Sequence, residues 1–245
     1  MHWPFDKAFR RSGPSTPDWP NVMAELAGRA RHPALKDFYE RGAVAGDTPI
    51  ESVPLAALDF ETTGLDPNRH SIVSVGIVPF DIGRIRCRGS AYWVVQPRRE
   101  LSQKSVTIHH ITHDEIAAAP DIGEIVEELL AAMAGRVIVV HYRLIERRFF
   151  DRMMINRFGE GLLFPVIDTM SVEARMQPLS RPGVLGRLFG RRPVSLRLAD
   201  CRARYHLPTY APHHALTDAL ATAELLQAQV AHHYSTDTPV RALWC

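Results

Sequence analysis

The sequence predicts an α/β fold in which a mixed β-sheet is flanked by helices. Three strand-like segments follow one another, and two short apolar strands then alternate with stretches of helical periodicity. Consecutive strands joined by short turns pair antiparallel, whereas strands separated by a helix pair parallel. We therefore expect an antiparallel meander followed by parallel strands in one sheet.

The predicted strands are apolar or rich in branched and aromatic side chains. The first is an apolar run that leads directly into Asp59, Phe60 and Glu61. The turn Asp81–Arg84 separates the second strand from the third, as in a meander. The five predicted strands span residues 53–58, 71–80, 89–96, 137–140 and 165–168.

The predicted helices show apolar residues at helical spacing or lie between helix start and stop signals. In the helix that begins at Ile122, Asp121 stands in the position of an N-cap. Pro212 precedes the last helix and is expected to start it or to lie just before it. The predicted helices span residues 21–31, 33–41, 122–134, 143–158, 196–205 and 215–232.

Composition excludes several classes of protein. The 245 residues are 46% hydrophobic and 23% charged, which is typical of a globular chain with one large core. The apolar runs are too short to cross a bilayer, and the N-terminus lacks a signal-peptide core, so we expect a cytoplasmic protein with no membrane partner. Cys87, Cys201 and Cys245 are odd in number and form no C-x-x-C pair, which indicates neither zinc nor disulfides.

The end of the first strand carries two carboxylates on one face. Side chains alternate along a strand, so Asp59 and Glu61 point to the same side while Phe60 points into a core. Carboxylates about 7 Å apart along one face repel each other unless a cation lies between them. The pattern indicates a site for a hard metal ion, although a bare D-x-E is also typical of a strand end with two solvated acids.

Two further segments carry acids at the starts of helices. His213 and Asp218 are five residues apart, a spacing that does not place them on one helix face. One interpretation is that both side chains converge on a metal ion and its bound water. The other is that His213 is a surface histidine and Asp218 an acid favoured at the start of a helix. Glu146 lies in the first turn of the helix that follows the strand 137–140, where the helix dipole alone also favours an acid.

Together these segments resemble the DEDDh family of 3′–5′ exonucleases, which includes the proofreading epsilon subunit of bacterial DNA polymerase III and its stand-alone relatives. Residues 59–65 match the first exonuclease motif, and residues 213–219 match the third, H-x-A-x-x-D-A. Residues 108–112 resemble the family's I-H-G-I-T segment, with His110 in place of glycine, and residues 167–169 resemble its D-T segment. The resemblance covers about residues 53–233.

The resemblance implies a ribonuclease H-like fold and a division of the chain. We expect an N-terminal extension over residues 1–50, irregular and then helical, an exonuclease domain over 51–235, and a C-terminal tail over 236–245. The second motif departs from the family pattern H-N-x-x-F-D, because His141 is followed by Glu146 at the position of the aspartate. Asp151 is the rival acid, but it lies across the helix from Glu146.

The resemblance also implies a mechanism that uses two divalent ions, Mg²⁺ or Mn²⁺. Asp59 would be the bridging ligand, Glu61 and Asp218 would join it, and Glu146 would complete the acidic set. His213 fits the general base, since imidazole titrates near neutral pH. The residues implied to cradle the 3′-terminal nucleotide are Thr62, Thr63, Gly64, Leu65 and His109.

An arginine-rich segment precedes the third motif. Arg187, Arg191 and Arg192 are interpreted as phosphate contacts, or alternatively as part of a solvated loop. The resemblance implies hydrolysis of single-stranded DNA or frayed ends from the 3′ end, releasing nucleoside monophosphates. The alternatives are trimming of RNA or short oligonucleotides, and a non-catalytic nucleic-acid-binding module. The expected partners are nucleic acid with a free 3′ end and a polymerase or repair protein.

Overall fold

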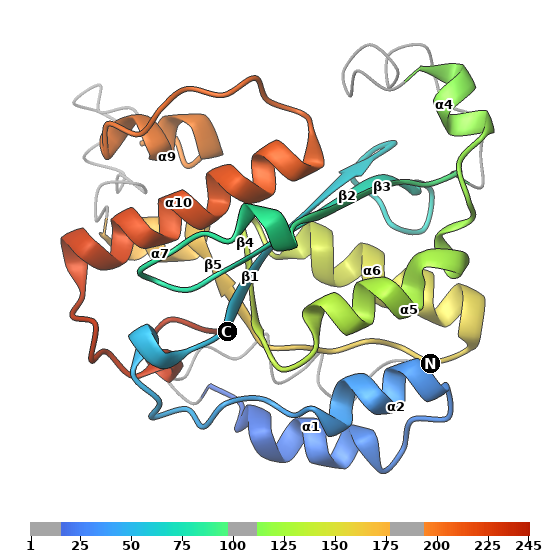
Figure 1. The fold of residues 1–245 in the computed structure, drawn as a ribbon, viewed down its shortest axis with the longest axis horizontal. Coiled ribbons are helices and arrows are strands. Elements are labelled where there is room, and N and C mark those ends of the chain that lie inside the picture. The colour runs from blue at the N-terminus through green and yellow to red at the C-terminus, as the bar shows by residue number, and fades with distance from the viewer. Residues whose placement is uncertain (1–15, 98–111, 177–193) are drawn as a thin grey trace, which may run out of the picture.

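A computed structural model of the chain describes residues 16–97, 112–176 and 194–245. Its centre is a five-stranded mixed sheet with the strand order β3-β2-β1-β4-β5 (Figure 1). The prediction for His109 and those for Arg187, Arg191 and Arg192 lie outside the described residues.

The sheet confirms the predicted succession of antiparallel and parallel strands. β1 pairs antiparallel with β2, which pairs antiparallel with β3, whereas β1 and β4, and then β4 and β5, pair parallel. β1 is longer than the apolar run and includes both predicted carboxylates. The strands are β1 Leu55–Thr62, β2 Ile72–Phe80, β3 Ala91–Val94, β4 Val137–Val140 and β5 Val166–Asp168.

Each predicted helix is present, with ends shifted by a few residues. Asp121 caps α5 as predicted, because its carboxylate accepts the Gly123 N–H at 2.8 Å. The last helix begins at Ala215, so Pro212 lies in the preceding loop. Two helices, α4 and α7, were not predicted. The helices are α1 Trp19–Ala27, α2 Pro33–Glu40, α4 His113–Ala117, α5 Ile122–Met133, α6 Leu144–Phe158, α7 Thr169–Met176, α9 Leu198–Arg204 and α10 Ala215–His233.

Alternation along β1 divides the core between the two faces of the sheet. Ala56, Leu58 and Phe60 pack with the apolar residues of α5 and α6. Leu55 and Ala57 pack on the opposite face with those of α7 and α10. Figure 1 shows α10 and α7 on one side of the sheet and α5 and α6 on the other. The next residues of β1 on the α10 side are the two carboxylates.

The N-terminal helices and the C-terminal segment both pack against the rest of the chain. Trp19 is fully buried in the core on the α10 side, and Phe38 is buried in the core on the α5 side. Tyr39 accepts the Leu163 N–H at 3.0 Å. At the other end of the chain, Trp244 forms an antiparallel bridge with Ile167 of β5. These contacts place residues of both terminal segments in the same core as the sheet.

None of the helices in the described ranges combines the length and the apolar character needed to cross a membrane.

Candidate active site

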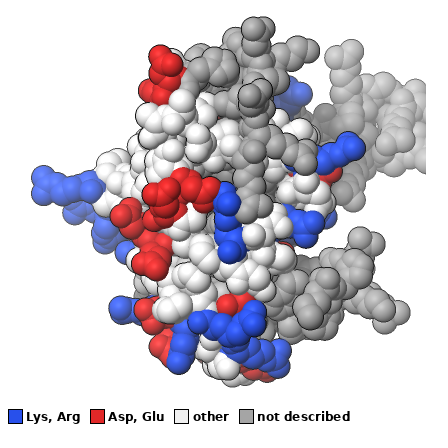
Figure 2. Space-filling model, turned by 90° about the vertical axis from the view of Figure 1, so that its right-hand side faces the viewer, with Lys and Arg blue, Asp and Glu red and all other residues white. Residues whose placement is uncertain are grey.

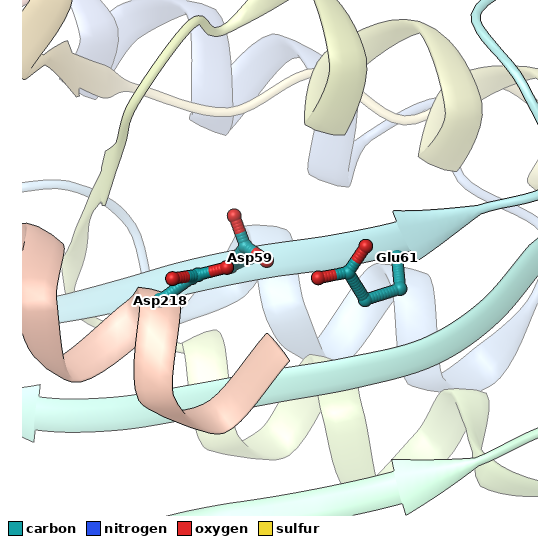
Figure 3. Close-up of side chains that lie close together, drawn as sticks. All are labelled: Asp59, Glu61 and Asp218. Atoms are coloured by element: carbon teal, nitrogen blue, oxygen red, sulfur yellow. The ribbon is translucent and has the colours of Figure 1, made fainter. Parts of the chain in front are cut away.

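Three carboxylates meet at the end of β1. Asp59 and Glu61 continue the face of β1 that α10 covers, and Asp218 lies in the first turn of α10. Figure 3 shows the three side chains close together, two from the strand and one from the helix. One oxygen atom from each lies within 4.8 Å of the others. The structure thus brings the first and third predicted motifs to one place.

Gly76 allows α10 to begin this close to the sheet. It is the register partner of Asp59 on β2. A Cβ built on Gly76 would stand 2.3 Å from the carbonyl carbon of Ala215, the first residue of α10. A glycine inside a strand often marks such a close backbone approach, so Gly76 in the apolar run 71–80 is the sequence signal of this contact.

His213 lies in the exposed loop before α10, as predicted. Its backbone has φ 69°, and its N–H donates to the Asp218 carboxylate at 2.9 Å. The bond brings the backbone of the predicted general base to one of the three clustered acids. His214, the next residue, stacks on Tyr92 of β3 with the ring centroids 4.6 Å apart. The two histidines therefore have different surroundings.

Glu146 is buried beside the cluster. Its side chain is 2% exposed, and its Oε2 atom has no hydrogen-bond partner among the residues that the structure describes. The pKa of Glu146 lies well above its usual range, because of burial first and the nearby charges of Asp59 and Asp168 next. Asp151, the rival acid, accepts the Leu162 N–H at 3.0 Å instead. Of the two acids, Glu146 is the one that interacts with Asp59.

The charges of the cluster are unfavourable without a counter-ion. The pKa of Asp59 is raised well above its usual range by burial and by the carboxylates of Glu61 and Asp218. Burial and Glu61 also raise the pKa of Asp218, although its bond from His213 opposes the shift. The carboxylate oxygens of Asp59, Glu61 and Asp218 suit a hard divalent cation. Glu146 is not one of these three clustered ligands, but its interaction with Asp59 places it next to them.

His141 and Asp168 hold the strand ends next to the site. His141 bonds to the Thr169 hydroxyl through Nδ1 and to the Leu196 carbonyl through Nε2, both at 2.8 Å. Burial lowers the pKa of the His141 ring. His141 thus bonds to a hydroxyl and to a backbone carbonyl. Asp168 is 2% exposed and accepts from the Arg143 guanidinium at 3.0 Å.

The loop after β1 is closed by its own hydrogen bonds. The Thr62 hydroxyl donates to the Gly64 carbonyl at 2.8 Å, and the Thr63 N–H donates to the Ser71 carbonyl at 2.9 Å. A Cβ on Gly64 would come within 2.6 Å of the ring of the exposed His70, which would have to move to admit a side chain there. Leu65, at the outside of the loop, is 81% exposed. Thr62, Thr63, Gly64 and Leu65, four of the five residues predicted to cradle a terminal nucleotide, thus lie directly after Asp59 and Glu61 in the chain.

The fold and the acid cluster define a ribonuclease H-like nuclease. The nuclease domain of 3′hExo, described as a DEDDh family member and solved with rAMP bound, superposes with a TM-score of 0.59 at 14% identity. The match covers 74% of this chain and 92% of that domain. A likeness at this identity concerns the fold alone, and it confirms the predicted architecture.

The chain belongs to the RNase T type of the exonuclease family, whose model matches residues 56–226. The DNA polymerase III epsilon subunit of Treponema pallidum (strain Nichols) is 30% identical over 75% of this chain and 79% of that protein. The PolC-type DNA polymerase III of Thermotoga petrophila is 28% identical over 73% of this chain. The chain matches only 12% of the length of that polymerase. These findings confirm the predicted resemblance and the prediction of an exonuclease.

Proposed function

We propose that the chain is a metal-dependent 3′–5′ exonuclease that removes nucleoside monophosphates from single-stranded DNA or frayed 3′ ends. The observation that carries the proposal is the convergence of Asp59, Glu61 and Asp218 within 4.8 Å. Family membership supports hydrolysis of a phosphodiester, and the name of the epsilon subunit supports DNA as the substrate. Action beside a polymerase or repair protein, in the cytoplasm, is part of the same proposal.

The acids are proposed to hold two ions, Mg²⁺ or Mn²⁺, because the ligand atoms that Asp59, Glu61 and Asp218 bring together are carboxylate oxygens. Asp59 is the proposed shared ligand, with Glu61 and Asp218 on one ion and Glu146 completing the set. When bound, two such ions about 3.5–4 Å apart neutralise phosphate charge, activate a water and stabilise the leaving oxygen.

His213 is proposed to take the proton from the attacking water. It lies in an exposed loop where solvent and substrate reach it, and its N–H is fixed to Asp218. An imidazole ordinarily titrates near pH 6.5, so it can accept a proton at neutral pH. Thr62, Thr63, Gly64 and Leu65 are proposed to contact the terminal nucleotide, as is His109.

Charge on the surface limits where the nucleic acid can run. Figure 2 shows acidic side chains gathered near the middle of the face on which α5 lies. Exposed acids of α5 are Glu124, Glu127 and Glu128. A phosphate backbone is repelled by such a surface, so the substrate is proposed to avoid this face and to approach from the carboxyl ends of β1 and β4.

RNA is the second candidate substrate, because the 3′hExo domain was solved with rAMP. The test uses DNA and RNA oligonucleotides of one sequence, labelled at either end. A 3′–5′ exonuclease shortens the 5′-labelled strand step by step and releases labelled mononucleotide from the 3′-labelled strand. Internal fragments, or 5′-labelled mononucleotide released as the first product without shortened intermediates, would contradict the proposal. The relative rates on DNA and RNA decide between the two substrates.

A further inference from the structure

Tyr142 has a backbone conformation that an aromatic residue rarely adopts. It follows β4 with φ 84°, in the left-handed region that glycine favours. Its N–H donates to the Asp168 carboxylate at 2.9 Å. The same carboxylate accepts from Arg143 and, at 2.8 Å, from the Ser171 hydroxyl. The conformation is therefore imposed by a buried, fully engaged acid.

The Tyr142 side chain is not accounted for by packing in the core. Its exposed fraction is 41%, and Tyr142 and Leu65 are the large hydrophobic residues that stand exposed in the described part of the chain. Backbone strain of this kind persists where the surrounding structure holds it, and it is often found at functional sites. A glycine would meet the backbone requirement with less strain, so the aromatic ring calls for a separate explanation.

Tyr142 lies at the same edge of the sheet as the acid cluster. β1 and β4 are neighbouring parallel strands, so the residues after their carboxyl ends are brought together. Tyr142 begins the turn that leads into α6, since its carbonyl accepts the Ile145 N–H at 3.1 Å. The next residue in that helix is Glu146, which interacts with Asp59. An exposed aromatic residue thus follows the strand next to β1, four residues before Glu146.

We propose that Tyr142 stacks on a nucleobase of the bound strand, close to its 3′ end. The inference rests on the proposed function, since it requires nucleic acid in the site. A flat ring on a fixed backbone stacks on any base and holds the strand without reading its sequence. Tyr142 is thus a residue that binds and positions the substrate, and it takes no part in proton transfer or metal binding.

The test is a binding measurement that needs no catalysis. Fluorescence anisotropy gives the dissociation constant of a labelled single-stranded oligonucleotide with nuclease-resistant phosphorothioate linkages, in the presence of Mg²⁺. We expect Tyr142→Ala to raise this constant about 5- to 150-fold, the range that corresponds to loss of one base–aromatic stack. Tyr142→Phe keeps the ring and should bind like the wild-type protein.

Abasic oligonucleotides separate stacking from a structural role. One oligonucleotide lacks the base of its last nucleotide, and a second lacks the base of its penultimate nucleotide. On the one that lacks the stacked base, the wild-type protein and Tyr142→Ala should have equal dissociation constants. Tyr142→Gly should unfold at the wild-type temperature or above it, because glycine relieves the backbone strain. An equal loss of binding on every strand, or no loss on the complete strand, would overturn the inference. Stacking without metal-dependent hydrolysis would overturn the proposed function alone.

Discussion

The backbone of Ala215 lies against Gly76, so that a Cβ at residue 76 would stand 2.3 Å from the Ala215 carbonyl carbon. Because Gly76 is paired with Asp59, this contact sets the distance between β1 and the first turn of α10. The separation of Asp59 and Asp218 therefore depends on a residue that has no side chain. It also explains how a strand and a helix far apart in sequence form one metal site.

Gly76→Ala should push the start of α10 away from the sheet. We expect a loss of stability of about 1–3 kcal/mol, as for other overpacked core sites, together with a large loss of metal affinity. Gly83→Ala is the matched control, because the nearest atom to its Cβ would be 3.5 Å away. Thermal unfolding and Mn²⁺ titration measure both effects. Unchanged metal affinity in a folded Gly76→Ala protein would contradict this explanation of the site.

Glu146 and Asp151 should differ in their effects, although both are acids of α6. Glu146→Ala should lower hydrolysis strongly, because it removes a buried carboxylate next to Asp59. Asp151→Ala should cost about 1–3 kcal/mol of stability by leaving the Leu162 N–H unpaired, and the turnover rate should stay near that of the wild type. The comparison requires turnover rates and unfolding curves for both variants. A reversed result would show that Asp151 is the functional acid.

Metal-free stability should depend on pH through the acid cluster. The pKa values of Asp59 and Glu146 are raised in the folded state. At a pH between the ordinary carboxyl pKa and these raised pKa values, the folded protein therefore binds more protons than the unfolded chain. The contribution of the two protonated acids to the free energy of unfolding is present at low pH and is lost as pH rises through the raised pKa values of the folded state.

Glu146→Gln removes one of the two coupled acids and is the test of that pH dependence. In chelator, the variant should gain stability relative to the wild type as pH rises, and saturating Mn²⁺ should reduce or reverse the difference. Unfolding midpoints measured across a pH series give both comparisons. If the difference in stability between Glu146→Gln and the wild type did not depend on pH, the interaction between Asp59 and Glu146 would be contradicted.

His213→Ala should lower the turnover rate about 10²–10⁴-fold, which is the usual cost of losing a general base. Metal affinity should change little, because the backbone N–H that bonds to Asp218 remains. His214→Ala is the control, since the His214 ring stacks on Tyr92. A near-normal turnover rate for His213→Ala would show that another group accepts the proton.

The sequence predicted the parts of the site that follow from local periodicity. Alternation in β1 put Asp59 and Glu61 on one face and Phe60 in the core, and the structure confirms both. The prediction for Glu146 rested on the resemblance of the second motif to the family pattern, and its role stays a prediction. The prediction for β1 succeeded because the strand period fixes the direction of side chains.

Tertiary contacts account for what the sequence did not predict. The close approach at Gly76 depends on a helix far along the chain, and no local pattern marks its partner. α7 begins directly after β5, and its cap is the last residue of that strand, Asp168, which accepts the Met170 N–H at 3.1 Å. The positive φ of Tyr142 depends on a hydrogen bond to Asp168, which belongs to another strand.

The central claim is that the clustered acids hold metal ions that hydrolyse a nucleic acid from its 3′ end. Its most direct test follows a 5′-labelled single-stranded DNA with metal-stripped enzyme, with and without added Mg²⁺ or Mn²⁺, beside Asp59→Asn. We expect a ladder shortening from the 3′ end only when metal is added, and none with a folded Asp59→Asn protein. Full activity in chelator, or a wild-type rate in Asp59→Asn, would contradict the claim.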